Sequence, residues 1–127
     1  MNSVVRRAAA DIASTAVGTA TLTSPGFNLG GRRGLYITVT TSSYTDGTWT
    51  PDVQVEDADG NWTTIWTAAA GISSATTTQY ELYPGISGGN LTEVDGITVP
   101  SPYRVRVVAS GGPSTGSAVA INISELP

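Results

Sequence analysis

Four of the ten carboxylates of this chain are candidates for acid–base chemistry. A pair of carboxylates can supply the acid and the base or nucleophile of a glycosidase-like cleft. Two of the four occupy outward-looking positions of expected strands, and the other two lie in an expected loop. The sequence alone therefore does not place any two of them at a working separation. These residues are Glu56, Glu81, Glu93 and Asp95.

The chain contains no histidine, no cysteine and no lysine, but has nineteen threonines and thirteen serines. Histidine titrates near neutral pH, and cysteine and lysine are the usual nucleophiles after serine. Imidazole and thiolate ligands for a metal are also missing. There is neither a Gly-x-Ser-x-Gly elbow nor a lysine-containing phosphate loop. We expect a protein that is not an enzyme, holds no cofactor or metal, and works through its surface.

The segment Asp57-Ala-Asp59-Gly60-Asn61 has oxygen-bearing side chains at alternate positions, as at the start of a calcium loop. A complete loop needs a glutamate near its twelfth position to close the coordination shell. The twelfth residue is Ala68, and no carboxylate lies nearby. Because Asp-Gly between two alternating segments is a strong hairpin signal, we interpret this segment as a hairpin turn.

Trp62 and Trp66 are four residues apart in an expected strand, so a regular strand places both on one face. Three roles fit such a pair: packing in the core, burial in a subunit interface, or a platform on which sugar rings stack. Trp49 comes just before an expected strand, and we expect it to pack over the end of the core.

The six arginines occur in three pairs and supply all the basic side chains of the chain. Paired arginines can bind carboxylates across a protein interface, and the alternative is solvated charge at strand ends. The net charge of −4 argues against a nucleic-acid partner, since counterion displacement from phosphates needs a basic surface. The pairs are Arg6 with Arg7, Arg32 with Arg33, and Arg104 with Arg106.

Short segments that alternate between apolar and polar residues follow one another along most of the chain, separated by glycine and proline. Leu35, Ile37 and Val39 of one segment share a face. Such a series predicts an all-β, antiparallel β-sandwich of seven to eight strands, either jelly-roll or immunoglobulin-like. Residues 85–100 carry four glycines and form the longest irregular stretch. The expected strands lie within residues 15–23, 35–40, 53–56, 63–67, 76–83, 103–108 and 118–123.

The first thirteen residues differ from the rest of the chain. Val4, Val5, Ala8 and Ile12 give a weak helical stripe, so this segment is expected to be a short helix or an arm that orders on contact. We therefore divide the chain into an N-terminal arm, residues 1–13, and a single sandwich domain, residues 14–127. No segment is apolar enough to be a membrane span or a signal peptide, and we expect no membrane partner.

Four segments of the chain recur in the same order and spacing in one protein family. They are Arg33–Thr40, Val53–Ile65, Tyr80–Ile86 and Pro102–Val108. Over about residues 15–125 the chain resembles small structural proteins of tailed bacteriophages, which are encoded among virion morphogenesis genes. The family has no catalytic residues. The resemblance implies a capsid decoration protein, or another minor part of the virion.

A decoration protein would be made in the host bacterial cytoplasm and bind the outside of the capsid. Its expected partners are the major capsid protein and neighbouring copies of itself, as a dimer or trimer. The N-terminal arm is expected to reach onto the shell. The alternatives are a neck or tail component, with residues 85–100 pairing between neighbours, and a virion-displayed carbohydrate-binding module. The candidate interface residues are Arg6, Arg7, Arg32, Arg33, Trp62 and Trp66.

Overall fold

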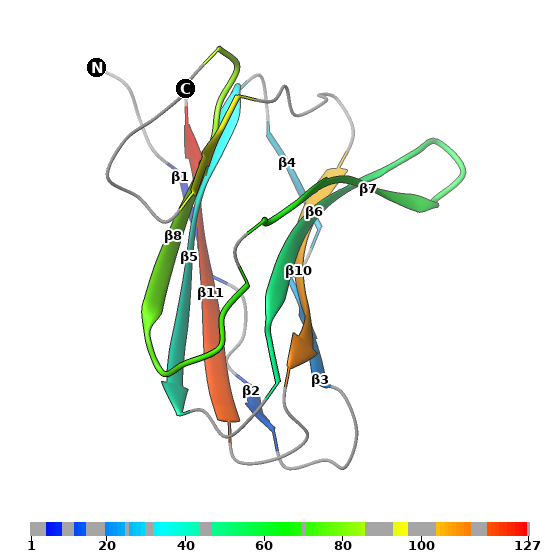
Figure 1. Ribbon diagram of the computed structural model, residues 1–127. Helices are drawn as coiled ribbons and strands as arrows, with labels where there is room; N and C mark the ends of the chain where they lie inside the picture. Colours follow the sequence, from blue (N-terminus) through cyan, green and yellow to red (C-terminus); the bar gives the residue numbers. More distant parts are fainter. Residues whose placement is uncertain are drawn as a thin grey trace.

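The structure is a computed structural model that describes residues 5–8, 12–14, 20–24, 26–29, 32–43, 47–69, 71–85, 93–96, 104–112 and 117–126. These residues form eleven strands and no helix, so the all-β prediction is confirmed. Nothing in these ranges could cross a membrane as a helix. Two sheets face each other, and the hairpin between β6 and β7 projects to the side (Figure 1).

The six-stranded sheet, sheet A, has β11 and β5 at its centre and β9 at one edge. Its strands are β1 (Val5–Ala8), β2 (Ile12–Ser14), β5 (Gly34–Ser43), β8 (Thr77–Leu82), β9 (Glu93–Asp95) and β11 (Ser117–Leu126). The five-stranded sheet, sheet B, has β10 and β6 at its centre and β7 at one edge. Its strands are β3 (Ala20–Thr23), β4 (Phe27–Asn28), β6 (Thr50–Glu56), β7 (Trp62–Thr67) and β10 (Arg104–Gly112).

The strand pairing is nested from the outside of the chain inward. Strands β1 and β2 pair with β11, β3 and β4 pair with β10, β5 pairs with β8, and β6 pairs with β7, all antiparallel. The nested pairs amount to one long antiparallel hairpin. Two further pairings, β11 with β5 and β10 with β6, fold this hairpin over into two sheets. That strand order is a jelly roll and not an immunoglobulin fold.

The core lies between the sheets and follows the alternation of the strands. In β5, the predicted face of Leu35, Ile37 and Val39 is fully buried. Val105 and Val107 of β10 close the core from sheet B, and Trp49 is fully buried in the same core. The intervening residues of these strands face outward. The outer face of each sheet therefore carries the polar residues of these strands.

The seven predicted strands are all present, and the four that were not predicted are two to four residues long. For residues 1–13 the helical alternative is wrong where the structure describes them, because β1 and β2 pair with β11. Residues 85–100 are not wholly irregular, because they contain β9. Strand β9 pairs with β8 in parallel, an exception to the antiparallel prediction.

Candidate interaction surface

A β-bulge in β7 separates the two tryptophans of that strand. Thr64 lies opposite Gln54, and Trp66 lies opposite Val53, so Ile65 is an extra residue without a partner. An extra residue reverses the faces of everything that follows it. Trp62 therefore lies on the outer face of sheet B, while Trp66 points into the core. The prediction that they share a face was wrong.

Trp66 is a core residue with a polar contact at its edge. It is 7% exposed and packs edge-on against Tyr80, with the ring centroids 5.7 Å apart. Its Nε1 donates a 2.7 Å hydrogen bond to Asp95 of β9. A sugar platform needed both tryptophans exposed, so the structure contradicts the carbohydrate-binding alternative in the form predicted.

Trp62 is half-buried and lies beside two arginines of β10. The guanidinium carbons of Arg106 and Arg104 are 4.2 Å and 5.9 Å from the centre of its ring. Cation–π attraction favours both positions. Gly26 lies beside one edge of the ring and beside Arg104, because a Cβ built there would be 3.2 Å from Cη2 of Trp62 and 3.5 Å from Nη1 of Arg104. The ring is thus held on one edge by backbone and flanked by positive charge.

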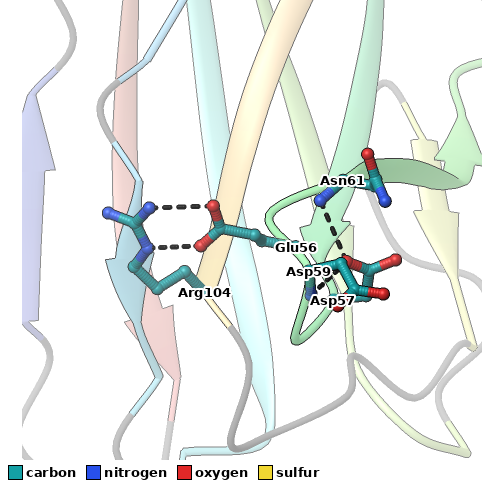
Figure 2. Close-up of polar contacts among 5 residues, drawn as sticks. All are labelled: Glu56, Asp57, Asp59, Asn61 and Arg104. Atoms are coloured by element: carbon teal, nitrogen blue, oxygen red, sulfur yellow. Dashed lines mark hydrogen bonds and ion pairs between the residues drawn. The ribbon is translucent and has the colours of Figure 1, made fainter.

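Arg104 is paired with Glu56 across the outer face of sheet B (Figure 2). Its Nε and Nη2 donate to the two carboxylate oxygens at 2.6 Å and 3.0 Å. These hydrogen bonds lower the pKa of Glu56 and raise the pKa of Arg104. The pair is on the surface, so it orders Arg104 beside Trp62 more than it stabilises the fold.

Arg106 is fixed by a neutral side chain. Its Nε donates a 2.8 Å hydrogen bond to Oε1 of Gln54, and Nε2 of Gln54 donates to Oγ1 of Thr64 at 3.3 Å. These residues form one row across β10, β6 and β7. We use the name Trp62 surface for Trp62, Arg104, Arg106, Glu56 and Gln54.

The turn between β6 and β7 is a hairpin turn, as predicted. Oδ1 of Asp57 accepts hydrogen bonds from the backbone N–H groups of Asp59 and Asn61, both at 2.9 Å (Figure 2). Backbone hydrogen bonding, first from Asn61, lowers the pKa of Asp57. Gly60 has φ of +87°, a conformation that glycine adopts without strain. The carboxylate that suggested a calcium ligand thus holds the turn.

The four carboxylates considered for catalysis lie in three places. Glu56 of β6 and Glu81 of β8 lie on different sheets. Glu93 and Asp95 come together on β9, where hydrogen bonding from Glu93 and then from Trp66 lowers the pKa of Asp95. Two carboxyl groups joined by a hydrogen bond are closer together than the roughly 5 Å that separates the catalytic pair of retaining glycosidases.

The predicted interface residues lie in several places. Arg6 and Arg7 are in β1, where they lie opposite Ser124 and Ile123 of β11. Arg33 is exposed before β5, with its guanidinium 5.6 Å from the centre of the Tyr83 ring, and Arg32 precedes it. Only Trp62 belongs to the surface described above. The contact of the arginines at positions 6, 7, 32 and 33 with a capsid stays a prediction.

Four residues of the Trp62 surface were not predicted as interface residues. Arg104 and Arg106 were noted only as a pair. Their spacing of two in an alternating strand was the available signal, since it places both on one face. Glu56 and Gln54 share the same spacing in β6. What the sequence did not reveal was the alignment of the strands, which brings both pairs beside Trp62.

Neither a protein-family model nor a curated protein matches this chain. Among solved structures, it is similar to a mitogen derived from Yersinia pseudotuberculosis, with a TM-score of 0.47, 12% identity, and coverage of 100% of this chain and 88% of that one. An exo-β-agarase has a TM-score of 0.47 and 12% identity over 87% of this chain and 18% of its own. A structure of infectious bursal disease virus, Gx strain, has a TM-score of 0.38 and 18% identity, covering 100% of this chain and 42% of that one. At these TM-scores the likenesses assign no function.

Proposed function

We propose that this chain is a non-enzymatic structural protein of a tailed-bacteriophage particle. In this role it decorates the head, binding the lattice of the major capsid protein and neighbouring copies of itself. The setting rests on the four sequence segments that resemble phage virion proteins. The mode of action rests on the structure. Jelly rolls occur in viral and lectin domains alike, so the fold alone does not choose between them.

The Trp62 surface is the observation that supports binding through a protein interface. Tryptophan and arginine are the residue types most enriched where truncation weakens protein complexes. Here a half-buried tryptophan and two arginines lie together on the outer face of a sheet, and Glu56 and Gln54 hold the arginines in place. Side chains that are already ordered lose less entropy on binding.

A protein of this kind stabilises the particle by binding only to the assembled lattice. The free energy of binding then adds to the stability of the head and not to that of free capsid subunits. The acidic chain would also be repelled by packaged DNA, which favours the outer side of the shell. Neither effect requires a catalytic group.

Particles made without this protein test the proposal. We expect such particles to assemble, to break at a lower temperature than complete particles, and to regain stability when the purified protein is added. Trp62→Ala protein should fail to restore stability, while Thr63→Ala, at an exposed position of the same strand, should restore it. Circular dichroism of both variants checks that they are folded.

The copy number on purified particles decides between head and neck. Decoration predicts enough copies to cover the lattice. Absence of the protein from purified particles would overturn the virion role. A few copies at a single vertex would instead assign the protein to the neck or tail.

A further inference from the structure

The two arginines of the Trp62 surface differ in what they bind. Arg104 uses Nε and Nη2 to hold both oxygens of Glu56. Arg106 uses only Nε, which donates to the neutral Gln54. Among the described residues, no carboxylate forms a salt bridge with Arg106. Even Asp52, two positions along β6 from Gln54 on the same face, does not pair with it.

Arg106 is nevertheless held in one place. Its guanidinium carbon lies 4.2 Å from the centre of the Trp62 ring, and the Gln54 amide fixes its Nε. Because Nε is occupied, the side of the guanidinium that remains for a ligand is the end formed by Nη1 and Nη2. Two parallel N–H groups at this end match the two oxygens of a carboxylate.

The local charge also favours an acidic ligand. Glu56 neutralises Arg104, whereas Arg106 has no ion-pair partner among the described residues, although Asp52 lies on the same face of β6. Arg106 is only partly exposed, so a carboxylate placed against it would be partly removed from water. Charge-assisted hydrogen bonds are strongest in such places.

We propose that Arg106 binds the carboxylate of an aspartate or glutamate of the major capsid protein, with the apolar stem of that residue against Trp62. The proposal rests on the proposed capsid role and names the chemistry of the partner residue. Arg104 stays bound to Glu56 and remains beside the Trp62 ring. Arg106 is the residue that recognises the partner.

Binding of purified variants to particles that lack the protein tests this assignment. Arg106→Gln should weaken binding by about tenfold or more, since it removes a charge-assisted pair. Arg106→Lys keeps the charge but loses the two-pronged geometry, and should fall between Arg106→Gln and the wild type. Glu81→Gln is the control, because it also removes one charge but lies in β8 of sheet A, away from the Trp62 surface. It should bind like the wild type.

The dependence of the binding affinity on salt concentration distinguishes an ion pair from apolar packing. Wild-type affinity should fall as the salt concentration rises, and Arg106→Gln should show a smaller fall. Equal affinity and equal salt dependence of Arg106→Gln and the wild type would overturn the carboxylate assignment while leaving the capsid role in place. If wild-type protein does not bind the particles, both proposals fail. Thermal unfolding of each variant checks that it is folded. If Arg106→Gln is unstable, Arg106→Lys takes its place in the comparison with the wild type.

Genetic suppression identifies the partner residue. Phage carrying Arg106→Glu should regain particle stability through changes of an aspartate or glutamate to lysine or arginine in the major capsid protein. Suppressors confined to this chain would place the contact between copies of the protein and overturn the capsid assignment. Suppressors in a gene for another virion protein would do the same.

Discussion

The indole nitrogen of Trp66 donates a 2.7 Å hydrogen bond to Asp95, and this bond joins an edge strand of sheet B to an edge strand of sheet A. A second bond lies beside it, from the backbone N–H of Ala69 to Glu93 at 2.9 Å. Both carboxylates belong to β9. The side chains of this short strand therefore connect the two sheets along one side of the sandwich.

Trp66→Phe and Asp95→Ala should each destabilise the fold, and their effects should not add. The double variant should lose about 1 kcal/mol less than the sum of the two single losses, because the hydrogen bond can be removed only once. Urea unfolding of the four proteins measures this. The control is Trp49→Phe, since within the described chain Nε1 of Trp49 makes no hydrogen bond. Coupling between Trp49→Phe and Asp95→Ala as large as that for Trp66 would contradict the assignment.

The stability of the protein should fall at acid pH, partly because of Asp95. Hydrogen bonding from Glu93 and Trp66 lowers its pKa in the folded state. The ionised form therefore stabilises the fold above the unfolded pKa of about 4, and this contribution is lost as the pH falls through the folded value. Asp95→Asn should show a shallower fall below about pH 4. The free energy of unfolding, measured by urea between neutral and acid pH, gives the comparison, and identical profiles would refute the prediction.

Iodide should quench the fluorescence of Trp62 and leave Trp49 and Trp66 almost unaffected. Trp62 is half-buried, whereas the other two indoles are 0% and 7% exposed. The two arginines beside Trp62 attract an anion, so iodide should quench more strongly than caesium. Trp62→Phe should abolish most of the quenching, and Arg106→Gln should reduce the preference for iodide. Strong quenching that persists in Trp62→Phe would show that the bulge does not separate the tryptophans.

Two glycines should differ in their tolerance of alanine. At Gly60 a Cβ meets no atom within 4 Å, and the φ of +87° is the only penalty, so Gly60→Ala should cost about 1 kcal/mol. At Gly34 a Cβ would lie 2.3 Å from the backbone oxygen of Leu82, which cannot move without breaking the pairing of β5 with β8. Gly34→Ala should therefore cost about 3 kcal/mol. Thermal unfolding of the two variants ranks them, and the reverse order would contradict the packing described.

Deletion of residues 2–14 should destabilise the sandwich itself. Strands β1 and β2 cover the edge of β11, and their loss exposes unpaired backbone groups of a ten-residue strand. The truncated protein should unfold at a lower temperature and aggregate at high concentration. Light scattering and calorimetry measure both effects. Unchanged stability would show that these strands contribute little to the fold.

Seven of the described strands could be predicted because apolar residues alternate within them, as in Leu35, Ile37 and Val39. The four short strands were missed for a physical reason. A segment such as Phe27–Asn28 is too short to show a period, and it is extended only because β10 lies beside it. In the same way, Val5–Ala8 forms a strand because β11 supplies a partner. Such elements depend on contacts that are distant in the sequence.

The candidate site shows a similar limit. Trp62 was predicted to share a strand face with Trp66, and this prediction assumed a regular strand. One unpaired residue, Ile65, moved Trp66 to the other face, and nothing in the local composition marks a bulge there. The grouping of Arg106 with Trp62 depends on how β10, β6 and β7 align. That alignment is set by the whole sandwich and not by any single segment.

The nested pairing has a consequence for how the chain reaches this fold. Strand β11 lies between β5 and the short strands β1 and β2, so Val5 pairs with Glu125 and Leu35 pairs with the same residue. To form contacts so distant in sequence, the chain must close large loops and lose entropy before the contacts stabilise it. Folding that depends on such contacts is slow. Until β11 arrives, β5 has an open edge in the middle of the future sheet. The protein should therefore fold on the millisecond-to-second timescale of other β-rich domains, with sheet A completed last.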